Sequence, residues 1–78
     1  ETRCVLENVK AILEACNLTL DDVVKSSIFI TDMNNFARIN AIYAEYFSGD
    51  NPPARETVQV AALPRSVNIE ISVIAVTQ

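Results

Sequence analysis

The chain has 78 residues, half of them hydrophobic, and ten acidic against six basic residues give it a formal charge of −4. A chain of this length forms one domain, taken as residues 1–78, and its scattered basic residues lack the stripe that tracks nucleic-acid phosphates. It contains no histidine, which excludes Ser-His and Cys-His catalytic pairs and the usual zinc sites. No apolar run approaches the roughly 20 residues that cross a membrane.

The first predicted element is an amphipathic helix that ends near Cys16, followed by Asn17, which suits the left-handed conformation that ends helices. Its pattern is already under way at Glu1, so we expect the chain to be the later part of a longer polypeptide. Cys4 and Cys16 lie about 18 Å apart along this helix and cannot bridge each other. We expect reduced, buried thiols and an intracellular location, in the cytoplasm or alternatively in mitochondria.

A strand is predicted next, followed by a second amphipathic helix. Residues 19–22 match a capping turn, and residues 23–31 are rich in β-formers, with one face predicted to carry Val24, Ser26, Ile28 and Ile30. Apolar residues then recur at helical spacing from Phe36 to Phe47, and Ser48-Gly49-Asp50 stops this helix. Tyr43 is predicted to be a core residue.

Two strands close the chain, and we predict that they pair as an antiparallel hairpin around residues 63–66. The order of elements is therefore α-β-α-β-β. If Ala62 and Val67 are the last paired residues, Glu70 lies opposite Gln59 and on the same sheet face as Arg55, about 13 Å away along the strand. The other face is predicted to be apolar and to cover the helices, with Val58, Val60, Val67, Ile69, Ile71 and Val73.

Arg55 and Glu70 are charged residues within the two most apolar strands, which makes them candidates for a site. A charge among Val and Ile side chains is costly unless it is paired or faces water. Within one hairpin they are too far apart for a salt bridge, but they can meet around a ligand or across a subunit boundary. The structural alternatives are an interface arginine paired with a neighbouring carboxylate, and a carboxylate at the rim.

The order and spacing of several motifs resemble the Rid family of enamine/imine deaminases. The resemblance extends over essentially the whole chain and rests on residues 6–15, 24–25, 29–36, 43, 46–47, 53–55 (Pro-Ala-Arg), 60–64 and 69–71 (Ile-Glu-Ile). It implies an α+β fold of the chorismate-mutase-like type, a sheet packed on two helices, with strands that precede Glu1 in the family. It also implies a homotrimer with clefts between subunits.

The same resemblance implies hydrolysis of 2-imino acids, such as 2-iminobutanoate and 2-iminopropanoate, without a cofactor or metal. By position, Arg55 matches the arginine that holds the substrate carboxylate, and Glu70 matches the glutamate that positions water. Asn40 matches an asparagine near the cleft, although a role on the helix surface is its simpler interpretation. Thr57 stands where several members carry cysteine, so no thiol contributes here.

Two other functions stay open at this stage. One is a non-catalytic trimer that binds ligands or protects proteins through the same clefts. The other is a ribonuclease or translation inhibitor, for which an acidic chain without histidine is a poor candidate. We therefore expect a small-molecule 2-imino acid as the partner, with no nucleic acid and no membrane.

Overall fold

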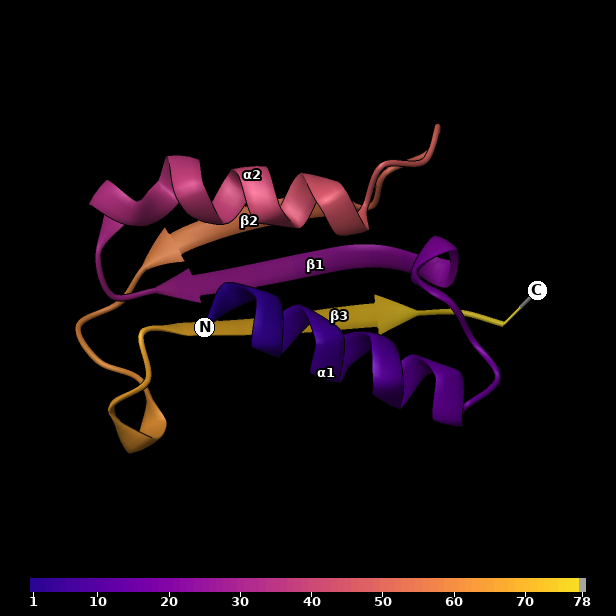
Figure 1. Cartoon of the computed structure of the whole chain (residues 1–78), viewed down its shortest axis with the longest axis horizontal. Helices are drawn as coiled ribbons and strands as arrows, with labels where there is room; N and C mark the ends of the chain where they lie inside the picture. Colours follow the sequence, from indigo (N-terminus) through magenta and orange to yellow (C-terminus); the bar gives the residue numbers. More distant parts are fainter. Residues whose placement is uncertain (78) are drawn as a thin grey trace.

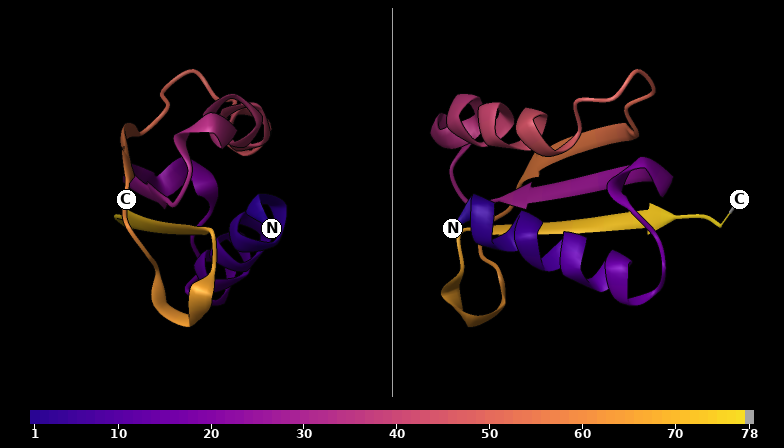
Figure 2. Two further views of the ribbon diagram at one scale, coloured as in Figure 1. Left: turned by 90° about the vertical axis from the view of Figure 1, so that its left-hand side faces the viewer. Right: turned by 45° about the vertical axis from the view of Figure 1, so that its right-hand side comes forward.

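The computed structural model describes residues 1–77, which form two helices and a three-stranded sheet (Figure 1). The two helices lie on one face of the sheet and leave the other face open (Figure 2). This confirms the predicted α-β-α-β-β order and the α+β class. The elements are α1 (Thr2–Ala15), β1 (Val23–Ile30), α2 (Phe36–Tyr46), β2 (Ala54–Gln59) and β3 (Ile69–Ala75), with short 3-10 turns at Leu20–Asp22, Met33–Asn35 and Pro64–Ser66.

The strand order is β2-β1-β3, so the predicted hairpin between the last two strands is wrong. β2 pairs parallel with β1, and β3 pairs antiparallel with the other edge of β1. The reason is the helix between β1 and β2: a strand, a crossover helix and a second strand return in the same direction. Residues 60–68 then carry the chain across to the far side of β1, a connection too long for a tight hairpin.

This topology also overturns the predicted pairing of Glu70 with Gln59 and the shared face of Arg55 and Glu70. Gln59 pairs with Ile30 and Glu70 pairs with Phe29, two neighbouring residues of β1. Because successive side chains of a strand point to opposite faces, Gln59 and Glu70 are on opposite faces. Arg55 is on the helix-covered face with Gln59, and Glu70 is on the open face.

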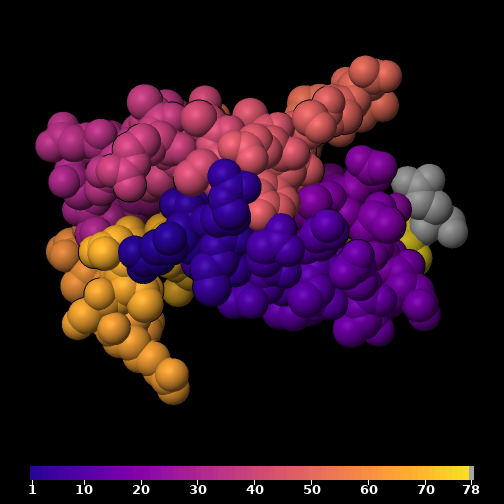
Figure 3. Space-filling view, viewed as in Figure 1, coloured from indigo at the N-terminus to yellow at the C-terminus, as the bar shows by residue number. Residues whose placement is uncertain are grey.

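The core lies between the sheet and the two helices, and α1 packs beside α2 and over β3. On the helix-covered side, the atoms of α1 lie directly against those of α2 (Figure 3). Ile69 and Ile71 point into it as predicted, whereas Val58 lies on the open face and is 40% exposed. A bulge between Val23 and Lys25 also turns Val24 outward, so Val23 is buried in its place. The buried core consists of Leu6, Ile28, Ile30, Ile39, Tyr43, Ile69 and Ile71.

Helix α1 ends where the sequence predicts, but its two cysteines are not buried as predicted. Asn17 has a φ of 62°, and the N–H of Leu18 donates to the carbonyl oxygen of Leu13 at 2.8 Å, which ends the helix as predicted. Cys4 and Cys16 are free, in agreement with their spacing. Both are exposed, so the prediction of buried thiols is wrong.

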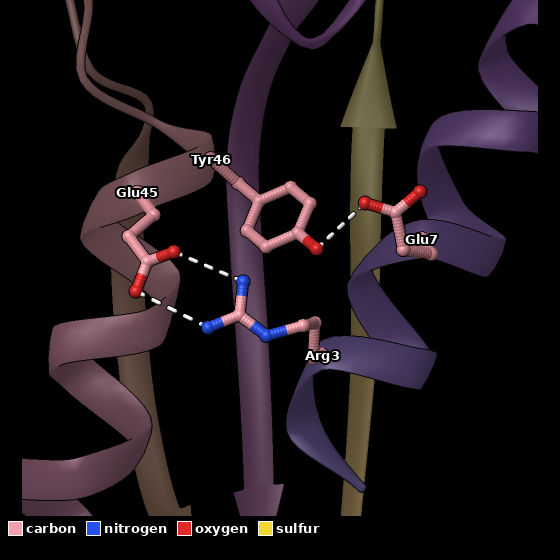
Figure 4. Close-up of polar contacts among 4 residues, drawn as sticks. All are labelled: Arg3, Glu7, Glu45 and Tyr46. Atoms are coloured by element: carbon pink, nitrogen blue, oxygen red, sulfur yellow. Dashed lines mark hydrogen bonds and ion pairs between the residues drawn. The ribbon is translucent and has the colours of Figure 1, made fainter.

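Two polar contacts join the helices across their exposed sides (Figure 4). The Arg3 guanidinium donates two hydrogen bonds to the Glu45 carboxylate, at 2.9 and 3.3 Å, and lowers the pKa of that carboxyl. The Tyr46 hydroxyl donates to Glu7 Oε2 at 2.6 Å, and this bond to a carboxylate raises the pKa of the Tyr46 phenol. Both contacts lie on the exposed surface between α1 and α2, where such pairs contribute little to stability.

Truncating Ile28, which is 1% exposed at the centre of β1, should destabilise the protein strongly. We expect Ile28→Ala to lower the free energy of unfolding by about 2 to 5 kcal/mol, since it opens a cavity in the core. Ile12→Ala is the matched control, because Ile12 is 66% exposed on α1. Urea unfolding measures both variants, and equal midpoints would contradict this description of the core.

Replacing Glu7 with Gln should return the pKa of the Tyr46 phenol toward its ordinary value, because the carboxylate acceptor is lost. The raised pKa means that this contact stabilises the fold fully below the unfolded phenol pKa of about 10, and that its contribution disappears as the pH rises through the folded value. Carbon-13 NMR titration of the tyrosine ring measures the shift. Glu56→Gln, on the open sheet face, is the control and should leave this titration unchanged.

Candidate functional site

Arg55 lies on edge strand β2, on the same side of the sheet as helix α2. In the parallel register it pairs with Ser26 of β1, a fully buried residue on the helix-covered face. Arg55 itself is exposed, because no strand lies beyond it at this edge. A planar guanidinium with an accessible edge can hold a carboxylate through two parallel hydrogen bonds.

Three side chains of α2 surround the guanidinium of Arg55, and we call these four residues the Arg55 cluster. The Arg55 Cζ atom lies 4.9 Å from the ring centre of Tyr43 and 5.9 Å from that of Phe36, both within the range of cation–π attraction. Arg55 Nη1 also donates to Asn40 Oδ1. The structure therefore brings Arg55 and Asn40 together, two of the three predicted site residues.

The Arg55 cluster rests on a buried hydrogen bond beneath it. The Tyr43 hydroxyl donates to Ser26 Oγ at 2.9 Å, and Tyr43 also stacks on Phe47, with ring centres 4.5 Å apart. Gln59, further along β2, accepts a hydrogen bond from the backbone N–H of Met33 at 2.7 Å. Both ends of β2 on this face are thus fixed against the segment that contains α2.

Glu70 lies away from this cluster, on the open face of the sheet. It is exposed, and no ion pair or side-chain hydrogen bond to it forms within residues 1–77. Its neighbours on the same face include Phe29, which is half-buried, and Ile74, which is 57% exposed. Nearby on β1 and β2, Ser27 donates to Glu56 Oε1 at 2.9 Å.

Arg55 and Glu70 of one chain cannot reach the same small ligand. Their partners in β1, Ser26 and Phe29, are three residues apart, or about 10 Å along the strand. The outer strands β2 and β3 are separated by about 10 Å more, and the two side chains point to opposite faces. Each chain therefore presents an arginine on one side of the sheet and a glutamate on the other.

Cavities also form at other places on the molecule, lined by residues other than Arg55 and Glu70. One, of about 270 Å³, lies where α1 begins, and another, of about 290 Å³, lies beside the end of α2. Within the described residues, no group of three or more His, Cys, Asp or Glu side chains lies in an arrangement that could hold a metal ion. No helix in residues 1–77 is long and apolar enough to cross a membrane.

Known proteins are similar to this chain in sequence and in fold. Residues 1–77 match the family described as Endoribonuclease L-PSP. The chain belongs to this family, which is also called the Rid family. The chain is 55% identical to a RutC family protein of Pyrococcus horikoshii, over 96% of this chain and 59% of that protein. It is 50% identical to the 2-iminobutanoate/2-iminopropanoate deaminase of Salmonella typhimurium, over 97% of this chain and 61% of the deaminase.

The fold agrees with solved structures of the family. The YjgF gene product of Escherichia coli superposes with a TM-score of 0.90 at 48% identity, covering 99% of this chain and 62% of that one. The α-β-α-β-β arrangement with its mixed sheet is thus the family's fold over this part. The chain spans about 60% of the length of these curated relatives.

Sequence reasoning placed Tyr43 in the core but missed its contact with Arg55. The signal was present in the spacing, because Phe36, Asn40 and Tyr43 stand at positions i, i+4 and i+7 of one helix and so share a face. The contact was missed because the predicted hairpin paired β2 with β3 instead of with β1. Once β2 pairs parallel with β1, the helix between them lies over Arg55.

Proposed function

We propose that this protein acts in the cytoplasm in the hydrolytic deamination of reactive 2-imino or enamine acids to 2-oxo acids and ammonia. The observation that carries the proposal is the Arg55 cluster, an exposed guanidinium held by Asn40 and Tyr43 in a family member about 50% identical to imine deaminases. Such a guanidinium suits a small carboxylate ligand, and an imino acid presents one.

Arg55 holds the substrate carboxylate in this proposal. Its Nη1 already donates to Asn40, while the edge formed by Nε and Nη2 has no acceptor within residues 1–77. Two parallel hydrogen bonds from that edge bind one carboxylate and fix the direction of the adjacent imine carbon. Asn40 contributes to substrate binding by positioning this guanidinium.

Glu70 of a second copy supplies the carboxylate that positions water. In the reaction, the oxygen of water bonds to the carbon of the protonated imine while the Glu70 carboxylate accepts a proton. That proton returns to nitrogen, and the carbon–nitrogen bond of the resulting aminoalcohol breaks to release ammonia. As the carbonyl forms, the Glu70 carboxylate takes the hydroxyl proton and passes it to the ammonia, which leaves as ammonium. One iminium and one water thus give one 2-oxo acid and one ammonium ion, without a cofactor or a metal.

The assembly proposed for this chemistry is a homotrimer. The open sheet face carries Phe29, Val58 and Ile74 beside Glu70, and apolar surface of this kind commonly marks a contact between chains. If this face packs against the β2 edge of another copy, Glu70 of one subunit comes toward the Arg55 cluster of the next. A trimer built in this way has a cleft between each two subunits.

Introducing a charge at Ile74 should weaken this assembly, because a buried lysine at the contact is costly. Sedimentation velocity at tens of micromolar should show a trimer for the parent protein and smaller species for Ile74→Lys. Ile12→Lys, at a 66% exposed position of α1 on the other side of the molecule, is the matched control. A parent protein that sediments as a clean monomer would rule out the trimer.

Variants of the two charged residues should affect imine hydrolysis differently. Arg55→Lys keeps the charge but loses the planar fork, and we expect kcat/KM to fall by roughly 10- to 1,000-fold, or about 1.4 to 4 kcal/mol. Glu70→Gln removes the base and should lower kcat while carboxylate binding survives. A threonine dehydratase generates the imine in a coupled assay, and Glu56→Gln on the same face as Glu70 is the control.

Mixing the two impaired variants tests whether the site spans two chains. When unfolded Arg55→Lys and Glu70→Gln chains are refolded together, some mixed trimers contain a cleft with both native residues, so activity should recover in part. Activity should not recover if both residues act within one chain.

If both variants fold, assemble and hydrolyse the imine at the parent rate, the deaminase proposal is wrong. Carboxylate binding without turnover would instead indicate a ligand-binding trimer.

A further inference from the structure

We propose that Tyr43 is a positioning residue that orients the guanidinium of Arg55 for carboxylate binding. The inference rests on the proposed function for the identity of the ligand, whereas the contacts that carry it are independent of the reaction. An exposed arginine on an edge strand has many rotamers, and each one that turns the fork away lowers the affinity for a carboxylate. Something must therefore hold Arg55 in place.

Of the two aromatic rings beside Arg55, Tyr43 is the one that is fixed. Its ring centre is 4.9 Å from Arg55 Cζ, against 5.9 Å for Phe36. Tyr43 is 6% exposed, whereas Phe36 is 36% exposed at the start of α2. A buried ring keeps its place, so Tyr43 provides the stable surface on which the guanidinium lies.

The Tyr43 ring is held at both its end and its face. Its hydroxyl donates to Ser26 Oγ at 2.9 Å, and Ser26 is fully buried in the central strand. Phe47 stacks on it with an interplanar angle of 24°. Ser26 is also the residue of β1 that pairs with Arg55, so β1 fixes both the ring and the backbone of the arginine.

Asn40 completes the arrangement from one turn earlier on α2. It accepts from Arg55 Nη1, which fixes the direction of the guanidinium within its plane, while Tyr43 lies under its face. The remaining edge is directed to the ligand. Tyr43 therefore acts through Arg55 and need not touch the substrate.

The experiment compares three tyrosine variants in the assembled protein. Tyr43→Leu removes the ring and should raise KM for the imine, and the dissociation constant for the product 2-oxobutanoate, about ten-fold, with kcat within two-fold of the parent. Tyr43→Phe keeps the ring and should recover most of this loss. Tyr46→Leu removes a tyrosine of the same helix that bonds to Glu7 instead, and both constants should stay at parent values.

Proton NMR of the Arg55 side chain gives a readout that does not depend on activity. In the parent and in Tyr43→Phe, the ring should shift the Arg55 Hδ resonances upfield, and in Tyr43→Leu this shift should vanish. If Tyr43→Leu fails to fold, the spectra of the parent and of Tyr43→Phe decide, since an absent shift in either overturns the proposal.

The outcomes separate this inference from the proposed function. Binding of 2-oxobutanoate that weakens in Tyr43→Leu, in a parent that hydrolyses no imine, supports the positioning role and refutes the deaminase. Turnover in the parent with an unchanged KM in a folded Tyr43→Leu refutes the positioning role and leaves the deaminase standing. A Tyr43→Phe variant as impaired as Tyr43→Leu also overturns the inference, because the ring is then not what matters.

Discussion

The parallel pairing of β1 with β2 is the constraint on which the rest of the structure depends. The crossover through α2 makes β1 the central strand and leaves β3 to pair with its other edge. The same crossover lays α2 over β2, so that Arg55 meets side chains spaced one turn apart on that helix. Had the last two strands formed a hairpin, Arg55 would not lie under α2.

A polar pair within the core illustrates how the site is tied to the fold. Ser26 is the fully buried polar residue of the central strand, and it accepts the hydroxyl of Tyr43. A buried hydroxyl costs stability unless it is hydrogen-bonded. Each hydroxyl therefore provides the hydrogen-bond partner that the other needs, and their bond joins α2 to the sheet directly below Arg55.

The distribution of charge over the two sheet faces bears on how the proposed chemistry is arranged. One face presents an arginine beside aromatic rings, and the other presents Glu70 among partly exposed apolar side chains. Within a single chain, Arg55 and Glu70 lie on opposite faces of the sheet and on its two outer strands, with β1 between them. In the proposed trimer, each active site lies at the contact between two subunits, so the protein must assemble in order to be active.

The sequence by itself determined the order and type of the elements, the end of α1 before Asn17 and the family, and it supplied Arg55, Asn40 and Glu70 as the candidate site residues. These depend on short-range periodicity, on turn chemistry and on motif spacing, all of which are local. Only the tertiary structure decided that β1 is central, that Arg55 and Glu70 point to opposite faces, and that Val24 turns outward at a bulge. Strand neighbours and bulges are set by how distant segments pack together, and the alternation of side chains along each strand is compatible with more than one pairing.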